Sequence, residues 1–370
     1  NVKSFGTYEV LISNVYGMIV SRGTTFSPSY FSRCEVSDIT AQEKALGFDG
    51  EYGLGGVEIY MADCHVKNVS AFDNLRRFRV YGFFLMNPHL YHCSVVNVSG
   101  WSSVGFWLNG RKGQTGESAD TGAGGEVYYC QASEISAIDT AYGMDADYLT
   151  VYGFECSVVS SPEGNVYGIR GNYCFLISCR VVELSCTHYA VYGIYTGSYT
   201  QLYDCSVENC ICYANDSRSY KYVYGIHLGR NNSLYDCRVS NLAGSSNSTA
   251  GVYVYGVYLE DDMNTVVDGC VISDVQATAR SAYNFALADA IGFNEYNYHH
   301  DNTGNTNIIT NVGVSNISAL ASCHREGDYW TEYQCKIDSV IGEKATGCDC
   351  VKRYLDQYGY QEEDRCEIFE

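Results

Sequence analysis

The chain has little of several things that most proteins use. Proline occurs 3 times in 370 residues, against an average usage of about 5%. No run of about 20 apolar residues exists, so the chain has no membrane-spanning helix. Basic residues are few, with 23 lysines and arginines against 43 acidic residues and a net charge of −20. That balance disfavours nucleic acid and anionic membranes as partners, because little could neutralise phosphates.

Concentrated catalytic and metal-binding motifs are also missing. The eight histidines do not share a position in the repeat described below. Glycoside hydrolysis needs two carboxyl groups about 5–9.5 Å apart. Two local pairs could supply them: Asp261 with Asp262, and Glu58 with Asp63. His299, His300 and Asp301 could bind a metal, but a solvated loop is the simpler interpretation. We therefore expect no catalytic residue, no metal site and no cofactor.

Cysteine and tyrosine are abundant, with 18 and 35 residues. Many cysteines in a long chain predict an exported protein in an oxidising setting. The start at Asn1 without methionine is expected of a processed chain or of a trimmed one. Six Asn-x-Ser/Thr sequons permit glycosylation, and three of them, at Asn68, Asn97 and Asn316, lie inside the repeat. The others are at Asn215, Asn231 and Asn247.

Two short motifs recur together about ten times. The first is Cys-x-Val-x-Asn-Val, as at residues 64–69 and 93–98. Its cysteines are Cys34, Cys64, Cys93, Cys130, Cys156, Cys179, Cys205, Cys237 and Cys270, and Val312 takes their place in a tenth copy. The second motif is Tyr-Gly, usually within Val-Tyr-Gly. Its tyrosines are Tyr16, Tyr52, Tyr81, Tyr142, Tyr167, Tyr192, Tyr224 and Tyr255.

The repeat length predicts the fold. Tyr142, Tyr167 and Tyr192 are 25 residues apart, which leaves room for two or three short strands. Helical periodicity is missing from the first 310 residues, and β-rich runs dominate instead. A propeller blade needs about 40–50 residues, which is too long for this repeat. We predict an all-β, right-handed parallel β-helix of about ten coils over residues 1–320.

A column of asparagine and aspartate follows each Cys-x-Val strand. We expect it to lie at a bend, where the side chains bond the backbone and one another. Its members are Asp38, Asn68, Asn97, Asn209, Asn241, Asp274 and Asn316. Glu134, Ser160 and Glu183 interrupt this column. Inward-facing cysteine and valine should stack on their equivalents in neighbouring coils.

The cysteines fall into two groups. We interpret the nine repeat cysteines as small buried residues in a column, with disulfides between adjacent coils as the alternative. The other nine lie off this column, on loops or near the C-terminus, and we expect most of them to form disulfides. They are Cys174, Cys186, Cys210, Cys212, Cys323, Cys335, Cys348, Cys350 and Cys366. The last five are odd in number, so one could pair with another chain.

The repeat tyrosines should face outward if the preceding valines face inward. They would then form an aromatic stripe that binds sugar rings or a neighbouring protein. Alternatively, they pack under loop insertions. The longest such insertion is the Gly-rich segment 109–125, which we expect to be a loop.

The last fifty residues differ from the repeat. Residues 321–370 are charged and rich in cysteine, which suits a cap or a docking segment at the end of a solenoid. Residues 350–358, followed by Gly359, predict a short helix.

The cysteine repeat resembles the parallel β-helix repeats of secreted surface proteins, adhesins, phage tailspikes and polysaccharide-active enzymes. The resemblance covers roughly residues 10–320. A narrower resemblance, in acidity, scarce proline and abundant Gly, Tyr and Cys, is to the major sheath proteins of filamentous methanogenic archaea. That resemblance implies an extracellular, cell-surface structural protein that assembles with itself into rings or filaments hardened by disulfides.

Self-assembly has a physical basis in the fold. The open ends of a β-helix carry unpaired strand edges, so head-to-tail and lateral contacts between copies are expected. The alternative function is that of a secreted or tailspike-type β-helix that binds or cleaves polysaccharide as a lyase or hydrolase.

Overall fold

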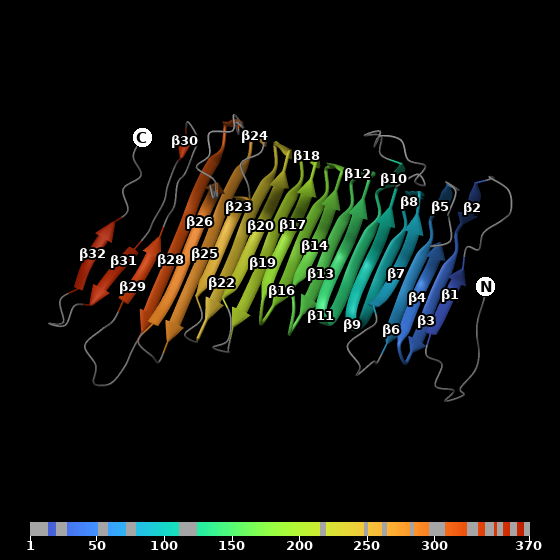
Figure 1. Ribbon diagram of the computed structural model, residues 1–370, viewed down its shortest axis with the longest axis horizontal. Helices are drawn as coiled ribbons and strands as arrows, with labels where there is room; N and C mark the ends of the chain where they lie inside the picture. The colour runs from blue at the N-terminus through green and yellow to red at the C-terminus, as the bar shows by residue number, and fades with distance from the viewer. Residues whose placement is uncertain are drawn as a thin grey trace.

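The chain winds into a right-handed parallel β-helix of about ten coils, stacked along one axis from the N-terminal to the C-terminal end (Figure 1). This computed structural model describes residues 14–19, 28–50, 58–71, 79–110, 124–214, 220–247, 251–260, 265–281, 285–295, 308–323, 332–336, 344–345, 351–355 and 361–365. The predicted fold class is confirmed.

Each coil contributes a short strand, a first long strand and a second long strand. The short strands form a ten-stranded parallel sheet. They are β2 (Ser29–Ser32), β5 (Ile59–Ala62), β8 (Pro88–Tyr91), β10 (Gly125–Tyr128), β12 (Leu149–Tyr152), β15 (Phe175–Ile177), β18 (Gln201–Tyr203), β21 (Ser233–Tyr235), β24 (Val266–Asp268) and β27 (Ile308–Thr310).

The long strands form two ladders. First long strands are β3 (Glu35–Ala41), β6 (His65–Ala71), β13 (Glu155–Ser161), β16 (Arg180–Cys186), β19 (Ser206–Ala214), β22 (Arg238–Ser246), β25 (Val271–Ser281), β28 (Gly313–Cys323) and β30 (Lys344–Ala345). Second long strands are β1 (Asn14–Ile19), β4 (Lys44–Gly50), β7 (Arg79–Met86), β14 (Val166–Asn172), β17 (Ala190–Ser198), β20 (Lys221–Arg230), β23 (Val252–Leu259), β26 (Phe285–Glu295) and β29 (Glu332–Lys336). In two coils a single continuous strand takes the place of the first and second long strands. These strands are β9 (Ser94–Asn109) and β11 (Gln131–Asp147).

Near the C-terminus the parallel ladders continue past residue 320, because β29 pairs with β26 and β30 pairs with β28. The helix predicted at 350–358 is wrong. Residues Val351–Leu355 form strand β31, which pairs antiparallel with β32 (Gln361–Arg365). A helix this short is marginal in water, whereas a paired strand has partners for its backbone groups. The division of the chain at residue 320 into a parallel β-helix and a C-terminal cap stays a prediction.

The two sequence motifs recur together because they touch. The valine of Cys-x-Val and the glycine of Tyr-Gly meet inside the rod, where the two long strands approach each other. A Cβ placed on Gly193 would lie 2.3 Å from Cγ1 of Val207 and 2.4 Å from the carbonyl oxygen of Gly225. Gly225 meets Val239 in the same way, at 2.3 Å. Only glycine fits this close approach.

The asparagine column lies at a sharp bend, as predicted. Asp38, Asn68 and Asn97 have φ values of 58°, 55° and 59°, a left-handed conformation that these residue types tolerate. The Nδ2 of Asn97 donates to Oδ1 of Asn68 at 2.9 Å, and that of Asn68 donates to Oδ1 of Asp38 at 2.8 Å. Ser160 is not the member of this column in its coil. Val158 is, with φ 53°.

The cysteine column is parallel and mostly buried, with two corrections. Cys34 is only half-buried. Cys64, Cys93, Cys130, Cys179, Cys205, Cys237 and Cys270 are at most 1% exposed. Cys156 instead pairs with Ala132 and Val181, which are valine-position residues. Phe154 takes the cysteine position, since its carbonyl accepts from the next coil (Arg180 N, 2.8 Å) as the carbonyls of Cys130 and Cys179 do. In this coil the Cys-x-Val sequence therefore lies two residues further along than in the other copies.

Candidate functional site

The second long strands present an outer surface unlike the others, here called the aromatic face. Its centre is the Tyr column, one residue per coil, in register across the rod. The column runs Tyr16, Leu46, Tyr81, Val104, Tyr142, Tyr167, Tyr192, Tyr224, Tyr255 and Ile291. Tyr52 lies outside the described residues, and Leu46 holds the position between Tyr16 and Tyr81.

Five consecutive members of the Tyr column form a continuous stack. Ring centroids are 4.8 Å apart from Tyr142 to Tyr167 and 4.7 Å apart from Tyr167 to Tyr192. The stack continues to Tyr224 at 4.9 Å and to Tyr255 at 5.1 Å. The residue before each of these tyrosines, an alanine at 141 and a valine in the other four, points inward and is fully buried. The tyrosines face outward, yet Tyr142, Tyr224 and Tyr255 are only 7–8% exposed, because their rings cover one another. A surface of this kind is rigid before any ligand arrives.

A second column lies three residues after the Tyr column on the same face. It carries Asp49, Phe84, Trp107, Asp145, Arg170, Tyr195, His227, Tyr258 and Asn294. The glycine and the residue after it are both buried, so side chains three positions apart share the outer face and their rings meet edge to face. Tyr192 and Tyr195 lie 5.5 Å apart with an interplanar angle of 87°. Phe84 and Trp107 stack at 4.2 Å.

Asp145 and Arg170 form an ion pair in adjacent coils of this column. Nη1 of Arg170 lies 3.6 Å from Oδ2 of Asp145, whose side chain is 9% exposed, against 37% for Arg170. Burial raises the pKa of Asp145, and the Arg170 guanidinium opposes that rise. Arg170 thus keeps part of its planar fork of donors toward solvent, which suits a carboxylate or a sugar hydroxyl.

His227 lies two coils further along, enclosed by aromatic rings. Tyr195 and Tyr258 stack on its two sides, each at 4.9 Å, and Tyr224 meets it edge-on at 5.0 Å. Burial lowers the pKa of His227 to about 4, so the imidazole is neutral at pH 7. Its Nδ1 is buried and has no hydrogen-bond partner among the described residues.

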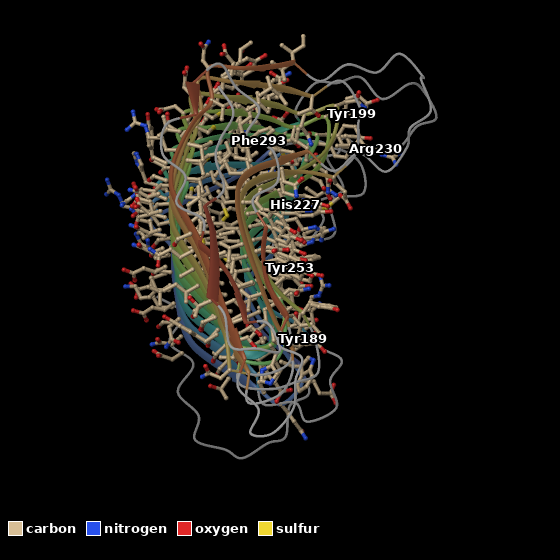
Figure 2. All side chains as sticks on the ribbon, turned by 90° about the vertical axis from the view of Figure 1, so that its left-hand side faces the viewer. Tyr189, Tyr199, His227, Arg230, Tyr253 and Phe293 are labelled. Carbon is tan, nitrogen blue, oxygen red and sulfur yellow. The ribbon has the colours of Figure 1, made fainter. Side chains whose placement is uncertain are left out.

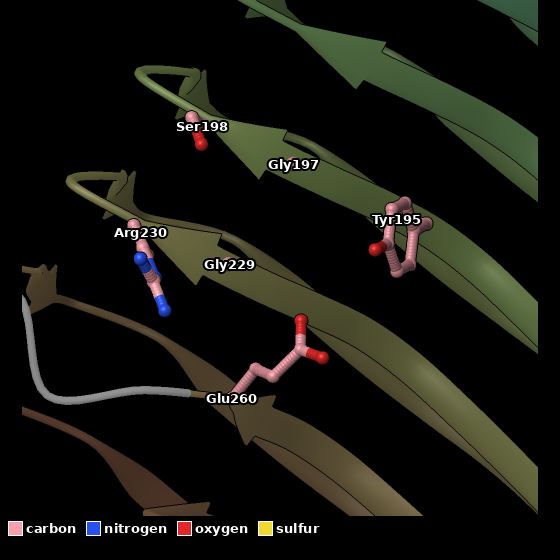
Figure 3. A pocket seen from close by; sticks show the side chains of 6 residues that line it. All are labelled: Tyr195, Gly197, Ser198, Gly229, Arg230 and Glu260. Atoms are coloured by element: carbon pink, nitrogen blue, oxygen red, sulfur yellow. The ribbon is translucent and has the colours of Figure 1, made fainter.

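Pockets of about 240 Å³ lie at both edges of the aromatic face. One is lined by Tyr195, Gly197, Ser198, Gly229, Arg230 and Glu260 (Figure 3). The other is lined by Trp101, Asp139, Thr140, Glu163, Gly164, Asn165 and Tyr189. Figure 2 shows His227 and Tyr253 between these edges, with Arg230 and Tyr199 at one end of the strands and Tyr189 at the other. Tyr199 and Tyr189 are more than half exposed.

Of the two candidate carboxyl pairs, Glu58 and Asp63 are among the described residues, and each contacts a different aromatic side chain. Glu58 accepts a hydrogen bond from the Tyr60 hydroxyl at 2.8 Å. Asp63 lies 3.8 Å from Nδ1 of His92. The remaining candidates, Asp261 with Asp262 and His299 and His300 with Asp301, lie outside the described residues. Within the described residues no three His, Cys, Asp or Glu side chains are grouped to hold a metal, and no helix is long and apolar enough to cross a membrane.

The off-column cysteines are in several environments. Cys174, Cys186, Cys210 and Cys212 are buried inside the coils, at most 2% exposed, and do not lie on surface loops. Cys323 ends β28 and Cys335 lies in β29. Cys348, Cys350 and Cys366 lie outside the described residues, as does Asn215. Asn247 is exposed and Asn231 is half-buried at a turn with φ 54°.

The second column was missed from the sequence. The histidines do not share a repeat position with one another, but His227 is in register with Tyr195 and Tyr258. The available signal was the residue two after glycine in each Tyr-Gly copy. Aligning the copies on that glycine places the aspartate, arginine, tyrosine and histidine in one row. Chemically, that row offers an anion-binding cation, a phenol and a neutral imidazole in three successive coils.

No protein-family description matches this chain, and no curated protein sequence does. Among solved structures, the A-module of the mannuronan C-5 epimerase AlgE6 of Azotobacter vinelandii is 12% identical, with a TM-score of 0.31. That alignment covers 87% of this chain and 89% of the other. The periplasmic alginate epimerase AlgG is 10% identical, with a TM-score of 0.21, covering 83% and 76%. The fold assignment here rests on the chain's own parallel ladders.

Proposed function

We propose that the aromatic face binds an extended polysaccharide that runs along the rod, across successive coils. The observation that carries this is the stack of five tyrosine rings beside a row containing Arg170, Tyr195 and His227. Aromatic rings bury large area at little entropic cost. The neighbouring cation, hydroxyl and imidazole supply hydrogen bonds that fix orientation.

The repeat suits a linear polymer for a geometric reason. Equivalent side chains recur once per coil, so a polymer of similar units can meet similar groups again and again. The pockets at the two edges then accommodate substituents. Arg170, half-exposed and held by Asp145, is the polar group most suited to a charged unit of the sugar chain.

The test compares two arginines in the same fold. Arg170→Ala removes the cation of the aromatic face. Arg180→Ala is the matched control, because Arg180 also contacts carboxylates, at 3.6 Å from Glu155 and 3.1 Å from Glu208, but on the outer face of the first long strands. Binding is measured by titration calorimetry with soluble neutral and uronic-acid polysaccharides. Arg170→Ala should bind at least roughly tenfold more weakly than the parent, a loss of about 1.4 kcal/mol in binding free energy. Arg180→Ala should stay within about twofold. Equal binding by both variants, or no binding by the parent, contradicts the proposal.

Cleavage of the bound polysaccharide is a second candidate, favoured by the neutral His227 imidazole, which lies next to Tyr195 and two coils beyond Arg170. A proton acceptor and a proton donor on one face are the elements of general acid–base catalysis. Release of new reducing ends from the bound polysaccharide would support it. His227→Ala should then abolish product while weakening binding much less, and a bound polymer that stays intact in the parent would exclude it.

The self-assembling sheath role concerns the ends of the rod and remains a separate prediction, with disulfides between chains as its chemical support. Negative-stain microscopy of the purified protein should show rings, tubes or fibres. Dispersed single rods at high concentration would contradict it.

A further inference from the structure

One inward column consists almost entirely of small residues. It lies at the end of each first long strand, where the chain turns toward the second, and is here called the corner column. Its members include Ala41, Ala71, Gly100, Ala137, Ser161, Cys186, Cys212, Gly244, Ala277 and Ala319. Cysteine occurs twice among them, in consecutive coils.

Cys186 and Cys212 are direct register partners on β16 and β19. Their Sγ atoms lie 2.8 Å apart and are buried, with the residues 2% and 0% exposed. Neighbouring strands bring Cα atoms to about 4.8 Å, within the 4.4–6.8 Å range that disulfides require. The corner is therefore a place where two coils could be joined without moving the backbone.

The cysteines of the repeat column also stack in adjacent coils, and their Sγ atoms contact backbone carbonyls. Cys205 directs its Sγ to the carbonyls of Leu176 at 3.4 Å and Tyr203 at 3.5 Å. Cys93 does the same with Met61 and Tyr91, at 3.7 and 3.5 Å. Cys212 also has a backbone carbonyl near its Sγ, that of Tyr189 at 3.8 Å. What marks the corner pair is the direct contact of 2.8 Å between its two Sγ atoms.

A buried lysine completes the surroundings of the pair. Lys221 is 0% exposed, and its Nζ donates to the carbonyl of His188 and lies 6.0 Å from the centroid of the Tyr189 ring. The hydrogen bond shared with Cys186 and burial raise the pKa of Cys212, while the Lys221 ammonium opposes the rise. The closed coil thus disfavours the thiolate, which is the reactive form in thiol–disulfide exchange.

We propose that Cys186 and Cys212 form a disulfide that joins two successive coils. Both S–H bonds break and one S–S bond forms. The two electrons and two protons pass to a small disulfide oxidant of the oxidised-glutathione class, which leaves as two thiols. Because the closed site excludes reagents, the exchange takes place while the coil is still open, during folding. The inference is independent of the polysaccharide proposal.

Peptide mapping tests the pairing. The full chain is refolded with reduced and oxidised glutathione, its free thiols are alkylated in denaturant, and it is digested after Glu, Lys and Arg without reduction. Cys186 then lies in peptide 184–208 with Cys205, and Cys212 lies in peptide 209–218 with Cys210. The expected result is one species containing both peptides, whose fragmentation spectrum places the bond between Cys186 and Cys212.

Matched variants exclude the neighbouring thiols. Cys210→Ala and Cys205→Ala should keep the linked species, since Cys210 is in register with Leu184 and Leu242 and Cys205 lies in the repeat column. Cys212→Ala should lose it completely. Recovery of Cys186 and Cys212 in alkylated form from the refolded parent, or a link that survives Cys212→Ala, overturns the proposal. The parent and Cys210→Ala results decide the matter even if Cys212→Ala does not fold.

Discussion

The two long strands of each coil share one interior but present opposite outer faces. The outer face of the first long strands is polar and solvated, with the asparagine column and ion pairs such as Lys67–Glu35 at 3.4 Å. That pair is about half exposed and contributes little stability. The aromatic face of the second long strands buries most of its own side chains. The polar composition of the first face is that of an ordinary solvated surface. The aromatic composition of the second face is typical of binding surfaces.

The largest expected effect comes from breaking the interior that both faces share. Gly193→Ala puts a Cβ 2.3 Å from Val207 and 2.4 Å from a backbone carbonyl, so neither neighbour can yield cheaply. We expect a loss of about 3 kcal/mol or more in the free energy of unfolding, measured by urea denaturation. Gly313→Ala is the control, because nothing lies within 4 Å of its added Cβ. Equal stability of the two variants would refute the glycine–valine contact.

The next effect concerns the aromatic face and depends on pH. Folding lowers the pKa of His227 from 6.5 to about 4, so the unfolded chain binds more protons between these values. The contribution of His227 to stability is full above pH 6.5 and is lost as the pH falls to 4, by about 3 kcal/mol.

Denaturation midpoints between pH 7 and pH 4 measure this loss. His227→Gln should flatten that part of the stability profile. His92→Gln, at a side chain 66% exposed, should leave the profile as steep as in the parent. A parent-like slope in the His227 variant would mean that other groups cause the pH dependence.

The smallest effect concerns the polar face. Val158 is a β-branched residue at φ 53° in a column of Asn, Asp and Glu, and it is 44% exposed. Val158→Asn should stabilise the fold by about 1 kcal/mol, seen as a higher melting temperature, because asparagine tolerates this conformation. Val271→Asn, at an exposed position that begins β25 in extended conformation, should bring no gain. A gain in both would point to surface polarity as the cause.

Much of the fold could be predicted because the inside of a β-helix repeats. At each copy cysteine and valine face inward and tyrosine faces outward, and this alternation is local. Errors arose where a coil departs from the pattern, as at Phe154 and Leu46, because only pairing with the neighbouring coils shows which residue fills a column. The candidate site was missed for the same reason: its residues share a position, not a residue type.

By itself, the sequence determined the repeat length, the inward and outward alternation and the left-handed bends, since these depend on strand geometry and on the backbone preferences of asparagine and glycine. The tertiary structure decided which residues became neighbours between coils. Loops of different length separate equivalent positions, so Asp145 meets Arg170 after 25 residues and Tyr195 meets His227 after 32. The register between coils is set by the close packing of glycine against valine. The spacing of these residues in the sequence does not reveal that contact.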